Sequence, residues 1–139
     1  MVVLIDTNVI LNFLTGRNDP FLKSSEEIMI LAAKNKFQGF FAIHTLLTIW
    51  YVLRKTRSEE DTRESIEKVC IYLKMATISR LEALNAIQNR HFHDFEDCLQ
   101  DECAFSIGAD YLITCNEKHF SNAKTQIINP DDFLKLHNF

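Results

Sequence analysis

Short blocks of apolar residues recur along the chain and predict the strands of a sheet. The first block, VVLID, is rich in β-branched residues and is typical of a strand that is buried on both faces. GFFAI, ATIS, DYLITCN and KTQIINP follow at intervals along the chain. The predicted strands cover residues 2–6, 39–43, 76–79, 110–116 and 124–130.

Between these blocks, apolar residues recur at the spacing of a helix. Leu46, Ile49 and Leu53 lie three and four residues apart, which places them on one face of a helix. VILNFL predicts a short helix or turn at 9–14, and the chain breaks at 16–20. The other predicted helices cover residues 21–35, 44–55, 58–72, 80–90, 91–109 and 130–139.

Polar residues and proline mark where several of these helices begin. Ser24 or Ser25 is the expected N-cap of the helix in 21–35, because a serine hydroxyl accepts from the free N–H groups of a first turn. Ser58 and Asp61 have the spacing of a capping box. Pro130 suits the first position of the terminal helix.

Strands alternate with helices through most of the chain. This alternation predicts a three-layer α/β/α sandwich with a central, mostly parallel sheet. The 139 residues, of which 47% are hydrophobic and 24% charged, are enough for a packed core. Because no repeat or linker is visible, we expect a single domain over residues 1–139.

The bulk chemistry of the chain removes several function classes. A net charge of -4 lacks the basic excess of a dedicated nucleic-acid-binding module, but it is compatible with a nuclease whose carboxylates hold metal. The four cysteines form no CxxC pair and indicate reduced thiols. No apolar run approaches about 20 residues and no signal peptide is visible. We therefore expect a cytoplasmic protein without a membrane partner.

Polar residues gather where strands of the predicted sheet end. Asp6-Thr7-Asn8 follows the first strand, and Thr114-Cys115-Asn116 ends the strand at 110–116. In a parallel sheet these two ends share one edge, where sites commonly form. An unpaired Asp6 beside a buried strand costs several kcal/mol, so we expect a compensating partner. A hard cation such as Mg²⁺ or Mn²⁺ would relieve the repulsion between clustered carboxylates and would support phosphoryl transfer.

Other acidic residues have structural interpretations beside the functional one. Asp94 and Glu96 stand where a helix begins, where acids commonly cap or complement the helix dipole. Asp101 shares a helical face with Asp97 but is also compatible with a solvated position. A metabolic enzyme that uses a nucleotide cofactor is disfavoured, because the chain has no GxGxxG, P-loop or GxSxG motif.

Four segments in order make the chain resemble the PIN domain family, and more narrowly its branch of VapC-type toxins. They are VLIDTNVILNFL, AIHTLLTIWYVLRK, DFEDCLQDECAFSIGADYLITCNEKHF and NPDDFL. The resemblance implies a PIN-like sandwich and a Mg²⁺- or Mn²⁺-dependent endoribonuclease, with RNA as its substrate. It also implies a small antitoxin protein as partner and a homodimer.

The same resemblance assigns roles to single residues. The first and third acidic positions of the family fall on Asp6 and Asp97, which are the implied metal ligands, and Asn8 stands beside the first. Asp6, Asp97 and Asn116 form the implied catalytic set, and Asn8 has a supporting role. Thr48 stands where the family has an acid or an amide.

The strand at 110–116 ends as relatives usually do, with threonine, any residue and then Asp or Asn, here Thr114-Cys115-Asn116. The departure follows directly after it, where His119 stands in the place of a frequent aspartate. The imidazole of His119 suits a general acid or a phosphate contact, or an exposed turn without a role. Because so few full carboxylates remain, Asp94, Glu96 and Asp101 are the candidate substitutes. The alternative function is a degenerate PIN domain that binds RNA or a protein without cutting.

The helix at 44–55 also has aromatic and basic residues near its end. Trp50 and Tyr51 are expected in the core or in a dimer interface rather than as a platform for bases. Arg54, Lys55 and Arg57 suit contacts to an RNA backbone, and equally suit the negative end of a helix dipole.

Overall fold

A computed structural model describes all residues from 1 to 139 and contains one five-stranded sheet. Its strands are β1 (Val2–Ile5), β2 (Gln38–Ala42), β3 (Lys74–Ala76), β4 (Tyr111–Ile113) and β5 (Ile127–Ile128). Every neighbouring pair is parallel, in the order β3-β2-β1-β4-β5. The parallel sheet predicted from the alternation of strands and helices is therefore confirmed.

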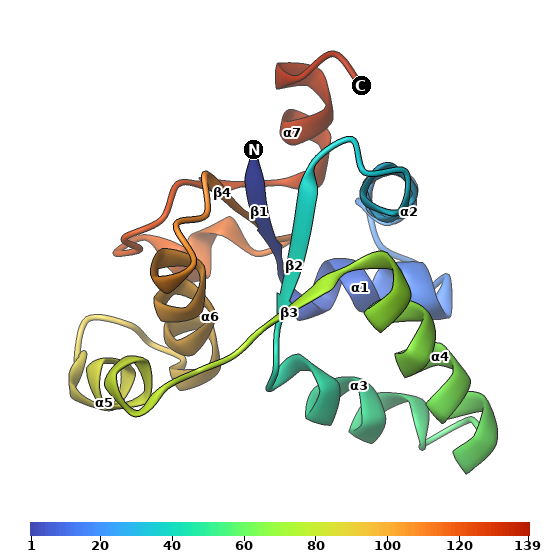
Figure 1. Cartoon of the computed structure of the whole chain (residues 1–139), viewed down its shortest axis with the longest axis horizontal. Coiled ribbons are helices and arrows are strands. Elements are labelled where there is room, and N and C mark those ends of the chain that lie inside the picture. Colours follow the sequence, from blue (N-terminus) through green and yellow to red (C-terminus); the bar gives the residue numbers. More distant parts are fainter.

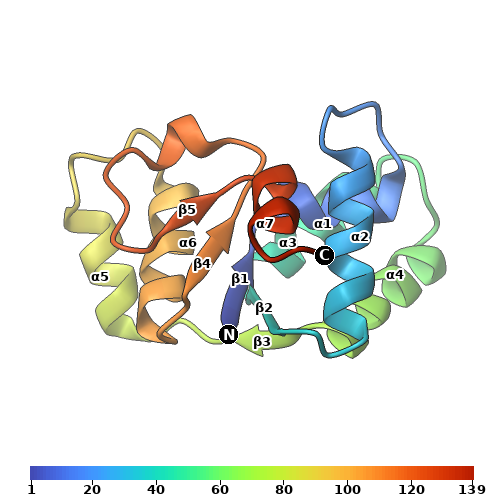
Figure 2. The same cartoon turned by 90° about the horizontal axis from the view of Figure 1, so that it is seen from above.

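Seven α-helices and one 3-10 helix connect these strands (Figure 1). They are α1 (Thr7–Thr15), α2 (Leu22–Ala33), α3 (Thr45–Leu53), α4 (Glu59–Tyr72), α5 (Arg80–Gln88), α6 (Phe95–Ser106), η1 (Glu117–Phe120) and α7 (Pro130–Leu136). Figure 2 shows α5 and α6 on one side of the strands and α2 and α4 on the other.

The sheet separates two apolar clusters, as the alternation of side chains along a strand requires. Val3 and Ile5 belong to the larger cluster, which contains residues of α1, α2, α3, α4 and α7. Leu4 belongs to the smaller cluster, with Cys103 and Ala104 of α6. The predicted three-layer α/β/α sandwich is confirmed by this arrangement.

One close approach depends on the absence of a side chain. A Cβ atom on Gly39 of β2 would lie 2.6 Å from Cδ2 of Leu73, which follows α4 directly. Leu73 is buried, so it cannot swing away without opening the core. Glycine at this position therefore allows α4 to end tightly against the sheet.

Three sequence predictions about element boundaries are wrong. Ser24 and Ser25 do not cap α2, because the helix begins at Leu22 and both serines are buried inside it. The strand predicted at 76–79 lies earlier, at Lys74–Ala76. The helix predicted over 91–109 starts only at Phe95.

Other boundary predictions are confirmed. The Ser58 hydroxyl accepts from the Asp61 backbone N–H, and Pro130 occupies the start of α7. A capping box that the sequence analysis missed lies at Ser79 and Glu82, which explains why residues after Ala76 leave the sheet and enter α5. No helix of the structure is both long and apolar enough to cross a bilayer.

The register of β1 and β4 places the two polar strand ends side by side. Ile5 lies opposite Ile113, and the Asp6 N–H donates to the Ile113 carbonyl at 2.9 Å. Asp6 is then the N-cap of α1, so the strand gives way to the helix within one residue. The carboxyl ends of β1 and β4 thus form the base of the candidate site.

Candidate active site

An open hollow of about 330 Å³ lies at the carboxyl edge of the central strands. It is lined by Asp6, Thr7, Asn8, Leu11, Arg17, Thr48, Asp94, Glu96, Asp97, Asn116 and His119. The structure thereby brings together residues from α1, α3, the start of α6 and the segment after β4. The sequence predicted most of this set, but it gave no reason for Arg17.

Asp6 is nearly buried, at 4% exposure, and its carboxylate accepts four hydrogen bonds. Oδ1 accepts from the Thr7 N–H at 2.7 Å and from Nε2 of Gln100 at 3.0 Å. Oδ2 accepts from Nδ2 of Asn8 at 2.8 Å and from the Thr114 hydroxyl at 2.7 Å. The sequence predicted that the charge of Asp6 needs a partner. The protein itself provides four hydrogen-bond donors to this carboxylate.

These hydrogen bonds do not cancel the effects of burial and of nearby acids. Burial raises the pKa of Asp6 to about 6, although the hydrogen bond from Thr114 lowers it. The neighbouring carboxylates of Asp97 and Glu96 raise the pKa further, and the Thr7 N–H lowers it. Asp6 therefore lies among negative groups that a cation would stabilise.

Beneath Asp6 lies a buried polar group that the sequence analysis missed. Nε2 of Gln100 also lies 3.0 Å from the Thr7 hydroxyl and 3.2 Å from the Thr45 hydroxyl. The two hydroxyls are 2.9 Å apart, and all three side chains are buried. Oε1 of Gln100 is buried without a hydrogen-bond partner. Gln100 thus connects α6 to the starts of α1 and α3.

Asp97 lies at the other side of the hollow, where α6 begins. Its Oδ2 is 3.1 Å from Nδ1 of His119, and Asp94 caps the helix by accepting from the Asp97 N–H at 3.0 Å. Burial raises the pKa of Asp97, the Asp94 charge raises it further, and His119 lowers it. His119 thus lines the hollow in contact with Asp97, although its ring is largely exposed, and both interpretations of its role stay open.

Thr48 faces the hollow from α3, where the family resemblance implies an acid. Its hydroxyl donates to Oε1 of Glu96 at 3.2 Å. Glu96 therefore places a carboxylate next to the position that Thr48 leaves without one. Asp94 and Glu96 both line the hollow, so the capping role of Asp94 does not remove it from the site.

The neutral residues of the set are arranged around Thr114, which is fully buried at the end of β4. The Thr114 hydroxyl accepts from Nδ2 of Asn8 at 3.2 Å and from the Asn116 N–H at 3.1 Å. Oδ1 of Asn8 accepts from the Cys115 N–H at 3.1 Å. Asn8 thus links α1 to the turn after β4, while Asn116 lines the hollow.

Asp101 does not line this hollow, and the alternative interpretation of a solvated residue is also wrong. It is 1% exposed and accepts from the N–H groups of Lys124 and Thr125 at 2.8 and 3.0 Å. Glu102 is also buried and pairs with the Lys124 ammonium at 2.5 Å. Asp101 therefore fixes a loop to α6 and is not a substitute ligand.

The donor set of the hollow suits a hard divalent cation in its chemistry, because it offers carboxylate, amide and hydroxyl oxygens. The charges of Asp97 and Glu96 raise the pKa of Asp6, and those of Asp94 and Glu96 raise the pKa of Asp97, a repulsion that a cation relieves. No three His, Cys, Asp or Glu side chains are arranged to hold one metal ion, however. A cation here would be held by Asp6 and Asp97 together with neutral oxygens.

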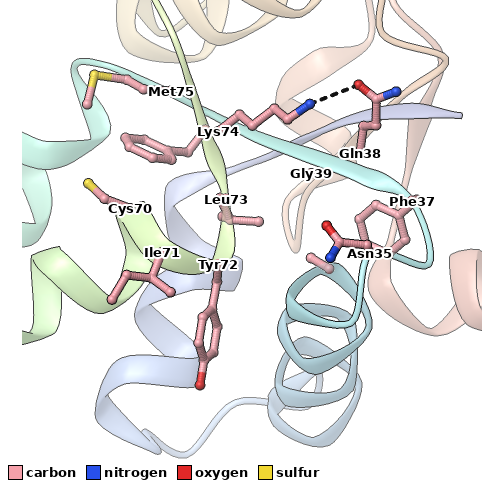
Figure 3. A pocket seen from close by; sticks show the side chains of 12 residues that line it. Asn35, Phe37, Gln38, Gly39, Cys70, Ile71, Tyr72, Leu73, Lys74 and Met75 are labelled. Carbon is pink, nitrogen blue, oxygen red and sulfur yellow. Dashed lines mark hydrogen bonds between the residues drawn. The ribbon is translucent and has the colours of Figure 1, made fainter.

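Two other surfaces have less chemistry to offer. Tyr51 on α3 is 67% exposed, so of the two expected positions the core is excluded and the dimer interface stays a prediction, while Trp50 is half-buried beneath Arg54 and Arg63. Figure 3 shows a second hollow, of about 470 Å³, between the ends of α2 and α4 and the strands β2 and β3. Its lining is mostly apolar and contains no acid.

Comparison with known proteins identifies a family and several structures of similar fold. The family described as PIN domain matches residues 2–118. Among curated proteins no sequence match is found.

Several solved structures are similar in fold. DNA-bound VapBC from Salmonella typhimurium superposes with a TM-score of 0.71 at 18% identity, covering 94% of this chain and 98% of that chain. FitAcB from Neisseria gonorrhoeae gives 0.67 at 16% identity, with 92% and 97% covered. VapC20 from Mycobacterium tuberculosis, described as a toxin that cleaves the sarcin-ricin loop, gives 0.61 at 10% identity, with 79% and 86% covered.

Proposed function

The chain belongs to the PIN domain family, and we propose that it is a metal-dependent endoribonuclease that acts as the toxin of a toxin–antitoxin pair. The single observation that carries this proposal is the hollow in which Asp6, Asp97 and Asn116 meet at the carboxyl edge of the sheet. Bound Mg²⁺ or Mn²⁺ would activate a water for attack on an RNA phosphodiester and stabilise the leaving oxygen.

Each residue of the chain has a distinct task in this proposal. Asp6 and Asp97 provide the charged oxygens for the cation, and Asn116 provides a neutral one. Thr114 and Asn8 hold the Asp6 carboxylate in place through Oδ2. His119, in contact with Asp97, is positioned to exchange a proton with the substrate or product at the rim.

The partner proposal is supported by relatives and by one surface. A similar structure from Klebsiella pneumoniae is described as a toxin–antitoxin complex. On this chain, Leu47 and Tyr51 of α3 are 75% and 67% exposed and lie one turn apart. Such an apolar stripe suits an antitoxin segment or a second copy of the chain.

The test is cleavage of RNA by the pure protein. We expect cleavage of single-stranded RNA in Mg²⁺ or Mn²⁺, none in a chelator, and a loss of cleavage in Asp97→Asn with the thermal unfolding profile retained. Lys118→Gln, an exposed change in η1, is the control and should cleave like the wild type. If purified protein cleaves no RNA in a panel of sequences and metals, the nuclease proposal is wrong.

A second candidate function is a PIN domain that binds RNA or protein without cutting. Two observations favour it, namely Thr48 at the position of an expected acid and the lack of three acidic or histidine groups around one point. Calorimetric titration with Mn²⁺ separates the two functions. A dissociation constant in the micromolar range supports the nuclease, and no measurable binding supports the non-cleaving domain.

A further inference from the structure

Arg17 is the only lysine or arginine that lines the acidic hollow. Gly16 caps the C-terminal end of α1 with a positive φ of 59°, in the left-handed conformation, and Arg17 is the next residue. The Arg17 side chain is exposed, but it runs back along α1, because it bonds to Asn12 and Asn8 of that helix.

Two hydrogen bonds hold the guanidinium in this position. Nε donates to Oδ1 of Asn12 at 2.5 Å, and one terminal nitrogen donates to the Asn8 carbonyl at 3.2 Å. Asn12 is fully buried, and its Nδ2 donates to the Ser25 hydroxyl at 3.2 Å. A buried amide anchored to α2 therefore fixes the head of a side chain that is otherwise exposed.

The guanidinium has no acidic partner although carboxylates line the same hollow. The ion pairs of the structure involve Arg63, His119, Lys124 and Lys135, and none involves Arg17. Both bonds that fix Arg17 go to neutral oxygens, so its full positive charge remains available. The N–H groups that make no bond within the protein remain free to bind an anion.

We propose that Arg17 binds a phosphate group of the RNA strand as it lies across the acidic hollow. This inference rests on the proposed function and adds the side chain that attracts the substrate to it. A phosphodiester backbone that approaches Asp6, Glu96 and Asp97 meets repulsion, and the fixed guanidinium provides the opposing attraction. Arginine suits this task because its planar fork matches two phosphate oxygens at once.

The alternative is that Arg17 only stabilises the end of α1. A structural role requires the bonds to Asn12 and Asn8, but it does not require the side chain to line an open hollow beside carboxylates. The two roles predict different effects when Arg17 is replaced. Loss of a phosphate contact changes the affinity for RNA and its dependence on salt, whereas loss of a helix-end contact lowers the stability of the free protein.

The test measures binding of a labelled single-stranded RNA by fluorescence anisotropy in Ca²⁺ over a range of salt concentrations, with gel analysis showing that the RNA stays intact. For Arg17→Gln we expect the Kd to rise about 5- to 20-fold, and the slope of log Kd against log salt to fall by about 0.7, the value for one phosphate contact on a single strand. Arg17→Lys should keep most of the slope, because it retains the charge. Arg80→Gln, at the start of the distant helix α5, should change neither quantity (Figure 1).

Two results overturn the assignment. An unchanged salt slope in Arg17→Gln does so, particularly if the thermal midpoint falls, and the guanidinium then belongs to the fold or to an acidic protein partner. The absence of RNA binding by the wild type does so as well. If the RNA binds through Arg17 but no metal supports cleavage, the proposed nuclease activity fails and the phosphate contact stands.

Discussion

Two buried aspartates of this protein, Asp6 and Asp101, show how differently the same side chain is used. Both are almost inaccessible, at 4% and 1% exposure. Asp101 accepts from two backbone N–H groups of one loop, beside the ion pair of Glu102 and Lys124. Asp6 accepts from four donors, two in α1, one in α6 and one at the end of β4, and it shares an open hollow with other acids.

The difference teaches which buried acids hold a fold and which form a site. The partners of Asp101 are main-chain groups, so the acid provides the acceptor that two N–H groups of the loop need. Around Asp6, neutral donors hold a charge whose nearest charged groups have the same sign. Burial alone therefore does not identify the functional acid, whereas burial in the company of other acids does.

The rate of RNA cleavage tests the difference between Asp6 and Asp101 most directly. Asp6→Asn should lower the rate of RNA cleavage in Mn²⁺ by about 1,000-fold, or about 4 kcal/mol, because the buried charge that holds the cation is lost. Asp101→Asn should leave the rate per folded molecule within about threefold of the wild type. Equal losses in the two variants, measured on protein with matched folded fractions, would contradict the division of roles.

Stability should respond in the opposite way. Asp101→Ala leaves the N–H groups of Lys124 and Thr125 without their acceptor, and we expect the free energy of unfolding to fall by about 3 kcal/mol. Urea denaturation followed by circular dichroism measures this change. Glu27→Ala, an exposed change in α2, is a surface control and should stay within about 0.5 kcal/mol of the wild type.

The pH dependence of stability should single out Asp6. Its pKa is about 6 in the folded protein and near 3.8 without the fold, so between these values the folded state retains a proton that the unfolded state has lost. The contribution of Asp6 to the free energy of unfolding should therefore fall by about 2 kcal/mol as the pH rises from 4 to 6, and level off above that. The wild type compared with Asp6→Asn, without metal, isolates this term, and parallel curves for the two proteins would refute it.

The smallest effect concerns Thr48. Thr48→Val removes the hydroxyl that donates to Glu96, and we expect the affinity for Mn²⁺ to fall about two- to threefold as the carboxylate loses its fixed position. Thr56→Val, an exposed change after α3, should have no effect. Calorimetric titration of both variants decides whether Glu96 matters to the site at all.

The sequence predicted the sheet well because its strands are compact apolar blocks between polar turns. Where boundaries failed, a local interaction that the periodicity does not contain decided the outcome. Ser79 lies outside the strand predicted for it because it caps α5. Residues 91–94 lie outside the predicted helix because Asp94 caps α6. In both cases a side chain satisfies free N–H groups, which fixes a boundary more strongly than apolar spacing does.

The candidate site was predictable in part. Strand ends in a parallel sheet converge, so Asp6 and Asn116 follow from topology, whereas Asp97 at a helix start was placed only through the family resemblance. Gln100 escaped because a single amide in a helix gives no sign of burial, although Cys98 and Cys103 around it are apolar. Arg17 escaped because only its bonds to Asn12 and Asn8 direct it back along α1.

The four hydrogen bonds on Asp6 have a kinetic consequence. A carboxylate has about four acceptor positions, and two donors on each oxygen occupy all of them. Any new ligand of Asp6 must therefore replace a donor, so that loading of the site is an exchange reaction rather than a simple encounter. Asn8 is the only one of these donors on a partly buried side chain that faces the hollow. In the proposed nuclease, a cation that binds Asp6 through Oδ2 would take the place of the Asn8 amide, so the displacement of Asn8 would be a step in metal loading.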